Sequence, residues 1–167
     1  MSKFDELCQA NATSRNNYFN YVEECRRFAR QLINGLLDNW IVPKGNLRYF
    51  PTNEEPDSAK NYTLAGGLHL DDDTYCHLGV EMILDENMQT IPQQAISIIF
   101  HIKKQDDGRF IVKVDSADPG HLIDANSASD NQQFYDFLFQ LIKDNLETDL
   151  QRFLQSKSTR RIGFIHS

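Results

Sequence analysis

The chain has 167 residues, of which 40% are hydrophobic and 25% are charged, and its formal net charge is −7. This composition is typical of one globular domain and excludes an intrinsically disordered chain. Because the negative charge repels phosphate backbones, we expect no nucleic-acid partner. No stretch approaches the ~18 apolar residues that a membrane-spanning helix needs, so we expect no membrane partner.

The three cysteines, Cys8, Cys25 and Cys76, are odd in number, far apart in the chain and without metal-type spacing. We expect them to be reduced thiols. Residues 1–6 lack the basic start and apolar core of a signal peptide. Together these two observations predict a cytoplasmic protein.

The first predicted element is a long amphipathic helix over residues 14–40. Its apolar residues recur at the i, i+3, i+4, i+7 spacing of one buried stripe, and they are Tyr18, Tyr21, Val22, Cys25, Phe28, Ala29, Leu32, Ile33, Leu36 and Leu37. Pro43 and Gly45 then end the helix. We expect residues 1–13 to form either a separate helical turn or a frayed end.

Apolar residues alternate through the middle of the chain, which predicts an antiparallel meander of four or five strands. The predicted strands cover residues 47–50, 62–70, 76–84, 96–102 and 110–114. Asp71-Asp72-Asp73 and Asp106-Asp107-Gly108 supply two of the turns. The even-numbered side chains of these strands form the more apolar face of the sheet.

A second long amphipathic helix is predicted after a capping box at Ser129-Asp130-Asn131-Gln132. Its apolar residues are Phe134, Phe137, Leu138, Leu141, Ile142, Leu146, Leu150, Phe153 and Leu154. We expect residues 156–167 to be a frayed end, with an edge strand over 162–165 as the alternative. No repeat or linker divides the chain, so residues 1–167 are expected to form a single domain.

The order of helix, meander and helix predicts a two-layer α+β fold. Both helices would pack on the even-numbered face of the sheet, because that face can bury their apolar stripes. The alternative places one helix on each face. Small and apolar residues on the odd-numbered face keep this alternative open, namely Ala65, Gly67, Gly79, Ile83, Ile99 and Ile111.

Keeping apolar residues together on one face fixes the register of the predicted strands. The apolar pairs that result are Leu70–Cys76, Leu68–Leu78, Leu64–Met82, Leu78–Phe100 and Val80–Ile98. On the other face this register sets His69 opposite His77 and His77 opposite His101. A shift by two residues in the second hairpin would preserve the faces but move His101 along its strand.

Three imidazoles on strands about 4.8 Å apart suggest one site for a transition metal ion such as zinc. Glu81 or an aspartate of the turn would lie nearby. A zinc-bound water would then make the protein a metal-dependent hydrolase, with Glu81 as the general base. The more common interpretation of such a row, and the one that the sequence favours, is polar side chains on a half-exposed sheet face.

The function that the sequence favours is therefore protein binding without catalysis, as in an adaptor, a secretion chaperone or an immunity protein. The partner would be another protein or a second copy of the chain, as in a dimer. Candidate contact residues are Ile83, Ile99 and Ile111, which are expected to face solvent, and Trp40 at the end of the first helix. A small-molecule site between the first helix and the sheet is a further alternative.

Overall fold

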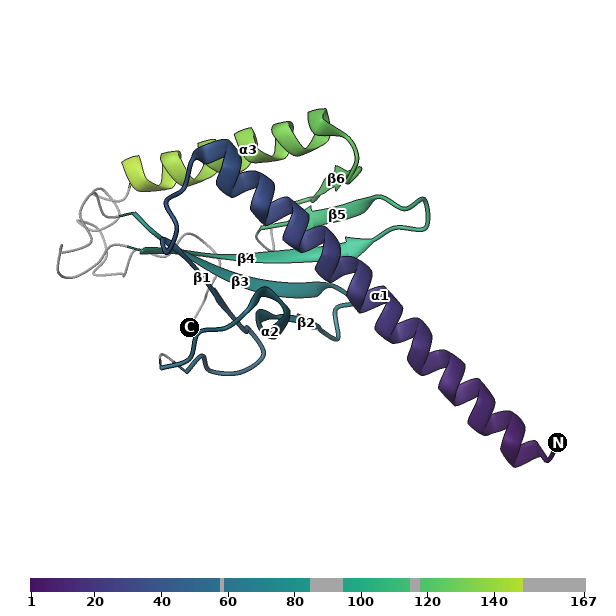
Figure 1. Ribbon diagram of the computed structural model, residues 1–167. Coiled ribbons are helices and arrows are strands. Elements are labelled where there is room, and N and C mark those ends of the chain that lie inside the picture. The colour runs from purple at the N-terminus through teal and green to yellow at the C-terminus, as the bar shows by residue number, and fades with distance from the viewer. Residues whose placement is uncertain (58, 85–94, 115–117, 149–167) are drawn as a thin grey trace.

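The computed structural model describes residues 1–57, 59–84, 95–114 and 118–148. Two long helices lie against a six-stranded antiparallel sheet (Figure 1), which confirms the predicted α+β class. The elements in chain order are α1 (Lys3–Trp40), β1 (Leu47–Phe50), α2 (Leu64–Gly67), β2 (Leu68–Leu70), β3 (Cys76–Ile83), β4 (Ala95–Lys104), β5 (Phe110–Lys113), β6 (His121–Ile123) and α3 (Ala128–Glu147). Within these ranges no helix is long and apolar enough to cross a membrane.

Helix α1 begins at Lys3, well before the predicted start at residue 14. The hydroxyl of Ser2 accepts a hydrogen bond from the backbone N–H of Asp5 at 3.1 Å, and the Asp5 carboxylate accepts one from the Ser2 N–H at 2.9 Å. This capping box satisfies N–H groups that a helix start leaves open. The helix is therefore continuous through the residues that were expected to form a separate turn or a frayed end.

The two halves of α1 have different surroundings. Residues 1–20 are all exposed, whereas the buried side chains of the helix begin at Cys25 and end at Leu36. Figure 1 shows the first half projecting beyond the sheet, while the second half crosses one of its faces. We call residues 3–20 the overhang.

The strands are ordered β1-β3-β4-β5-β6, and β2 also pairs with β3. Strand β1 lies opposite residues 79–82 of β3, and β2 lies opposite residues 76–78. The two short strands therefore lie end to end along the same edge of β3. All pairings are antiparallel.

The predicted register is confirmed for the pairing of β3 with β2 and with β4. Leu68 pairs with Leu78, Val80 pairs with Ile98, and the His69–His77 and His77–His101 pairs are all present. The shift by two residues in the second hairpin does not occur.

The predicted strand over residues 62–70 is wrong in its first part. Thr63 accepts a hydrogen bond from the backbone N–H of Gly66 at 3.1 Å and caps the short helix α2, which occupies Leu64–Gly67. Met82 consequently pairs with Leu47 and not with Leu64. Strand β2 keeps only Leu68–Leu70.

Both helices pack on the same face of the sheet, which carries the even-numbered residues of β3, β4 and β5. Phe28 of α1 stacks on Phe110 of β5 with ring centroids 4.0 Å apart. The hydroxyl of Tyr135 on α3 donates a hydrogen bond to the carbonyl of Leu32 on α1 at 2.9 Å. The predicted two-layer packing is therefore confirmed, and the alternative with one helix on each face is wrong.

Helix α3 begins two residues earlier than its predicted cap implied. Ser127 is the N-cap and accepts a hydrogen bond from the backbone N–H of Asp130 at 3.2 Å, so the capping box predicted from Ser129 is wrong. Strand β6, which precedes this helix, was not predicted. The expected continuation of the helix to Leu154 and the predicted end over residues 156–167 lie outside the described residues.

Candidate functional site

The three histidines of the sheet form a row across three strands. His77 on β3 pairs with His69 on β2 and with His101 on β4. Their ring centroids are 5.5 Å apart for His69 and His77 and 4.3 Å apart for His77 and His101. All three side chains lie on the odd-numbered face, opposite the core.

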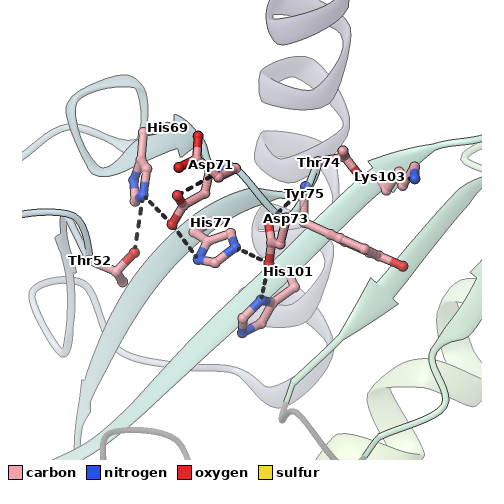
Figure 2. Close-up of polar contacts among 10 residues, drawn as sticks. Thr52, His69, Asp71, Asp73, Thr74, Tyr75, His77, His101 and Lys103 are labelled. Carbon is pink, nitrogen blue, oxygen red and sulfur yellow. Dashed lines mark hydrogen bonds and ion pairs between the residues drawn. The ribbon is translucent and has the colours of Figure 1, made fainter. Parts of the chain in front are cut away.

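Two aspartates from the turn between β2 and β3 reach this row. The turn is closed by backbone hydrogen bonds from Asp71 to Tyr75 and from Thr74 to Asp71, each 3.0 Å long. Thr74 adopts a left-handed conformation with a φ of 71°, which tightens the turn. Figure 2 shows the side chains of Asp71 and Asp73 pointing back toward the imidazoles.

His77 lies between the two carboxylates. Its Nε2 atom is 2.8 Å from Oδ2 of Asp73, and its Nδ1 atom is 3.7 Å from Oδ2 of Asp71. Nε2 of His69 is also 3.7 Å from that Asp71 oxygen, whereas Nδ1 of His101 is 3.9 Å from Oδ2 of Asp73. The cluster therefore has two halves that share His77.

Each half has a geometry that could hold a metal ion. His69, Asp71 and His77 form one group of possible ligands, and Asp73, His77 and His101 form the other, with the ligand atoms of each group within 4.8 Å of one another. Neither group contains all three histidines. The hypothesis that the three imidazoles converge on one ion is therefore wrong, because His69 and His101 flank His77 on opposite sides.

Proton positions make the two halves different. Burial opposes ionisation of Asp73, but hydrogen bonds from the Tyr75 N–H and from His77 outweigh it and lower the pKa of Asp73. An ionised carboxylate can only accept, so the 2.8 Å contact requires a proton on Nε2 of His77. In a neutral imidazole this leaves a lone pair on Nδ1, which faces Asp71.

His69 supplies the third donor atom of the first group. Burial lowers the pKa of His69, the nearby His77 lowers it further, and Asp71 opposes both effects. A lowered pKa favours neutral imidazole, which is the form that binds metals. Thr52 Oγ1 lies 3.4 Å from Nε2 of His69, so the loop after β1 also reaches this position (Figure 2).

Glu81 does not belong to this cluster. It pairs with Arg48 on β1 and Ser97 on β4, four residues along β3 from His77. Four residues of strand correspond to about 13 Å. The prediction that Glu81 acts as a general base at a metal held by His77 is therefore wrong.

The predicted contact residues differ in how far they are exposed to solvent. Ile83 is buried, with 3% of its surface exposed, so the expectation that it faces solvent is wrong. Ile99 and Ile111 are half-buried on the odd-numbered face. Trp40 is also half-buried, and its ring contacts that of Phe139 with centroids 5.8 Å apart.

The space between α1 and the sheet, where a small-molecule site was considered, is filled by core side chains such as Phe28 and Phe110. An open cavity of about 810 Å³ lies instead beside β1, and Thr52, Glu81 and Ile99 are among its lining residues. Thr52 therefore borders both this cavity and the histidine row.

The aspartates of the cluster were only loosely foreseen, as a turn residue near the histidines. The signal that specifies them is the spacing His69, Asp71, Asp73 and His77, because a tight turn folds residues on both sides of it onto one face. Thr52 has no such signal, since its position depends on the pairing of β1 with β3. In comparisons with known proteins, no family model, no curated protein and no solved structure matches the chain.

Proposed function

We propose that the protein binds one divalent transition metal ion, with zinc as the first candidate, through His69, Asp71 and His77. The observation that carries the proposal is the convergence of Nε2 of His69 and Nδ1 of His77 on one Asp71 oxygen, each at 3.7 Å. Two imidazoles and a carboxylate favour zinc, copper or nickel over calcium or magnesium.

The spacing of these atoms supports an ion among them. Metal–nitrogen and metal–oxygen bonds of zinc are near 2.0–2.1 Å, which places tetrahedral ligand atoms about 3.3 Å apart. The two nitrogen–oxygen separations of 3.7 Å need to close by only a few tenths of an ångström, and all the ligand atoms of the group lie within 4.8 Å of one another. Three protein ligands would leave a fourth position for water or for a ligand of another molecule.

Asp73 supports this half of the cluster over the other. A metal-bound histidine usually donates its second N–H to a carboxylate, which fixes its orientation and makes it a stronger ligand. His77 and Asp73 already have this relation at 2.8 Å. A metal bound instead by Nε2 of His77 would displace the shared proton and break this hydrogen bond.

The alternative occupant of the position between His77 and Asp71 is a proton on Nδ1 of His77, which would hydrogen-bond to Asp71 in place of the metal. Titration calorimetry with zinc, with cobalt absorption spectra as a second measurement, distinguishes the two. We expect one ion per chain, bound at pH 8 and released on acidification. A protein that takes up neither zinc nor cobalt would contradict the proposal.

Variants identify which half of the cluster binds. His69→Ala and His77→Ala should each abolish binding, and Asp73→Asn should weaken it about 10- to 100-fold. His101→Ala and His121→Ala are the matched controls and should retain it. Loss of binding in His101→Ala with retention in His69→Ala would assign the ion to the other half.

Hydrolysis at the metal stays a prediction, but Glu81, the base suggested for it, lies too far along β3 to serve. The protein-binding module and the cytoplasmic location also stay predictions. A metal position held by two strands and one tight turn is compatible with either a catalytic or a structural use of the ion. The metal proposal does not depend on which of these applies.

A further inference from the structure

The overhang of α1 exposes large apolar side chains. Phe4 is 72% exposed, Leu7 69%, Tyr18 52% and Phe19 59%. Eighteen helical residues extend about 27 Å, so these side chains occupy a surface much longer than a single side-chain contact. Isolated apolar residues on a surface are ordinary, but a row of them along one helix indicates a contact surface.

Three of these four residues, Phe4, Leu7 and Tyr18, lie on the side of α1 that faces the core further along, whereas Phe19 lies about 100° around the helix from Tyr18. Phe4, Asn11, Tyr18, Cys25 and Leu32 follow one another at intervals of seven, and the last two are fully buried against the sheet. Leu7 lies one turn from Phe4 on this side. The overhang therefore presents to solvent the same stripe that the second half of α1 buries.

We propose that two copies of the chain pair through their overhangs, with the two helices antiparallel. The direction follows from the position of the stripe. In a parallel pair the partner helix would continue along the stripe into the space that the sheet occupies (Figure 1). In an antiparallel pair each overhang ends where the partner's sheet begins. The two sheets, with the helices that cover them, then lie at opposite ends of the paired overhangs.

The residue pattern of the overhang fits pairing with a second copy. Its two ends are apolar, with Phe4 and Leu7 at one end and Tyr18 at the other, and its middle is polar, with Asn11 and Ser14. Pairing with a second copy, in either direction, sets apolar ends against apolar ends and the polar middles against each other; the direction follows from the position of the sheet and not from this pattern. A single Asn within such a stripe selects one register and one partner number at some cost in stability.

Charge also favours a second copy over a charged partner. The overhang carries Lys3 and Arg15 against Asp5 and Glu6, so its formal charge is zero although the whole chain carries −7. Pairing through this segment places two neutral segments together and keeps the acidic remainders of the two chains apart. The repulsion between two copies is therefore smaller here than elsewhere on the surface.

Sedimentation velocity over a range of concentrations tests the pairing. We expect a species of twice the 19.3 kDa chain mass that dissociates on dilution. Leu7→Asp should raise the dissociation constant about a hundredfold, because the dimer loses two buried leucines. Asn16→Asp, which adds the same charge on the opposite side of the overhang, should leave it nearly unchanged.

Both variants should keep the helical content and unfolding free energy of the wild type, since neither residue contacts the body. A wild-type protein that stays strictly monomeric at high concentration would overturn the proposal. Equal loss of the dimer in both variants would also contradict it, because the stripe would then not be the contact.

Disulfide trapping tests the direction. Cys8 lies about 100° around the helix from Leu7 and therefore off the stripe, so it is replaced by serine in the test variants. Antiparallel pairing that opposes Phe4 to Tyr18 brings Ser14 of one copy near Leu7 of the other. A mixture of the Leu7→Cys and Ser14→Cys variants should therefore form an interchain disulfide between the two under a mild oxidant. Neither variant should form a disulfide by itself, because each new cysteine would face its own copy only in a parallel pair. Efficient cross-linking of either variant alone would contradict the antiparallel arrangement.

Discussion

The two faces of the sheet are built from the same strands but have opposite roles. On β3 the even-numbered Cys76, Leu78 and Val80 are at most 2% exposed beneath the helices. The odd-numbered His77 lies on the other face among aspartates and histidines. Because alternate side chains point to opposite faces, one face can be committed to stability while the other carries ionisable groups. The difference predicts that the cost of a substitution depends on whether its position is even or odd.

The sharpest form of this comparison uses two neighbours on β4. Phe100→Ala should lower the free energy of unfolding by about 3–5 kcal/mol, because it leaves a cavity among helices and sheet. Phe100 is 1% exposed, whereas the adjacent His101 is half-buried. His101→Ala should cost less than about 1 kcal/mol. Urea denaturation of both variants measures the difference, and similar costs would refute the division of roles.

The odd-numbered face should become stabilising once metal is bound. Zinc at a hundred times its dissociation constant should raise the free energy of unfolding by about 2.7 kcal/mol, because it binds the folded state alone. His77→Ala should show no such rise. Thermal unfolding with zinc and with a chelator measures it, with His121→Ala as the control. A rise of the same size in His77→Ala would show that zinc binds elsewhere.

Gly79 should be an exception to this comparison. It is an odd-numbered position, but Phe50 leaves no space for a side chain there. A Cβ atom there would lie 2.4 Å from a ring carbon of Phe50 and 2.6 Å from the Phe50 carbonyl oxygen. Gly79→Ala should therefore cost about 1–3 kcal/mol through displacement of β1. Glu81→Ala, two residues along the same face, should be nearly neutral. A neutral Gly79→Ala would mean that β1 can move away freely.

The smallest expected effect is the pH dependence of His69. Its pKa is lowered by burial, so the unfolded chain binds this proton more readily than the folded protein does. The stability that neutral His69 contributes is present above its ordinary pKa near 6.5 and is lost as the pH falls. In metal-free protein, His69→Gln should therefore show a flatter stability profile between about pH 7 and pH 5. Urea midpoints across this interval test it, and parallel profiles would contradict it.

The alternation of apolar residues predicted the pairing of β3 with β2 and β4, but it left a shift by two residues open in the second hairpin, which the structure excludes. The sequence was insufficient at Leu64, where alternation also continues but the Thr63 cap forms a helical turn. The start of α1 was missed although Ser2 and Asp5 have the spacing of a capping box. Strand β6 is too short to alternate detectably.

The candidate site was also predicted only in part from the sequence. The histidine row follows from register and was predicted, but the choice between a shared ion and two separate groups depends on how far the turn brings Asp71 and Asp73 over the row. That distance depends on turn conformation, in particular the left-handed Thr74. The remoteness of Glu81 required only the count of residues along β3, which the sequence already contained.

The end-to-end arrangement of β1 and β2 makes residues 51–67 an insertion within a single edge strand. Phe50 pairs with Gly79 and Leu68 with the adjacent Leu78, so β3 is paired without interruption along this edge. The alternation of faces also continues across the interruption, from Tyr49 through Phe50 to Leu68 and His69. The inserted loop carries Thr52 and Tyr62 of the cavity wall. Substitutions in this segment can therefore change the side chains that border the histidine row without changing the sheet that holds the row.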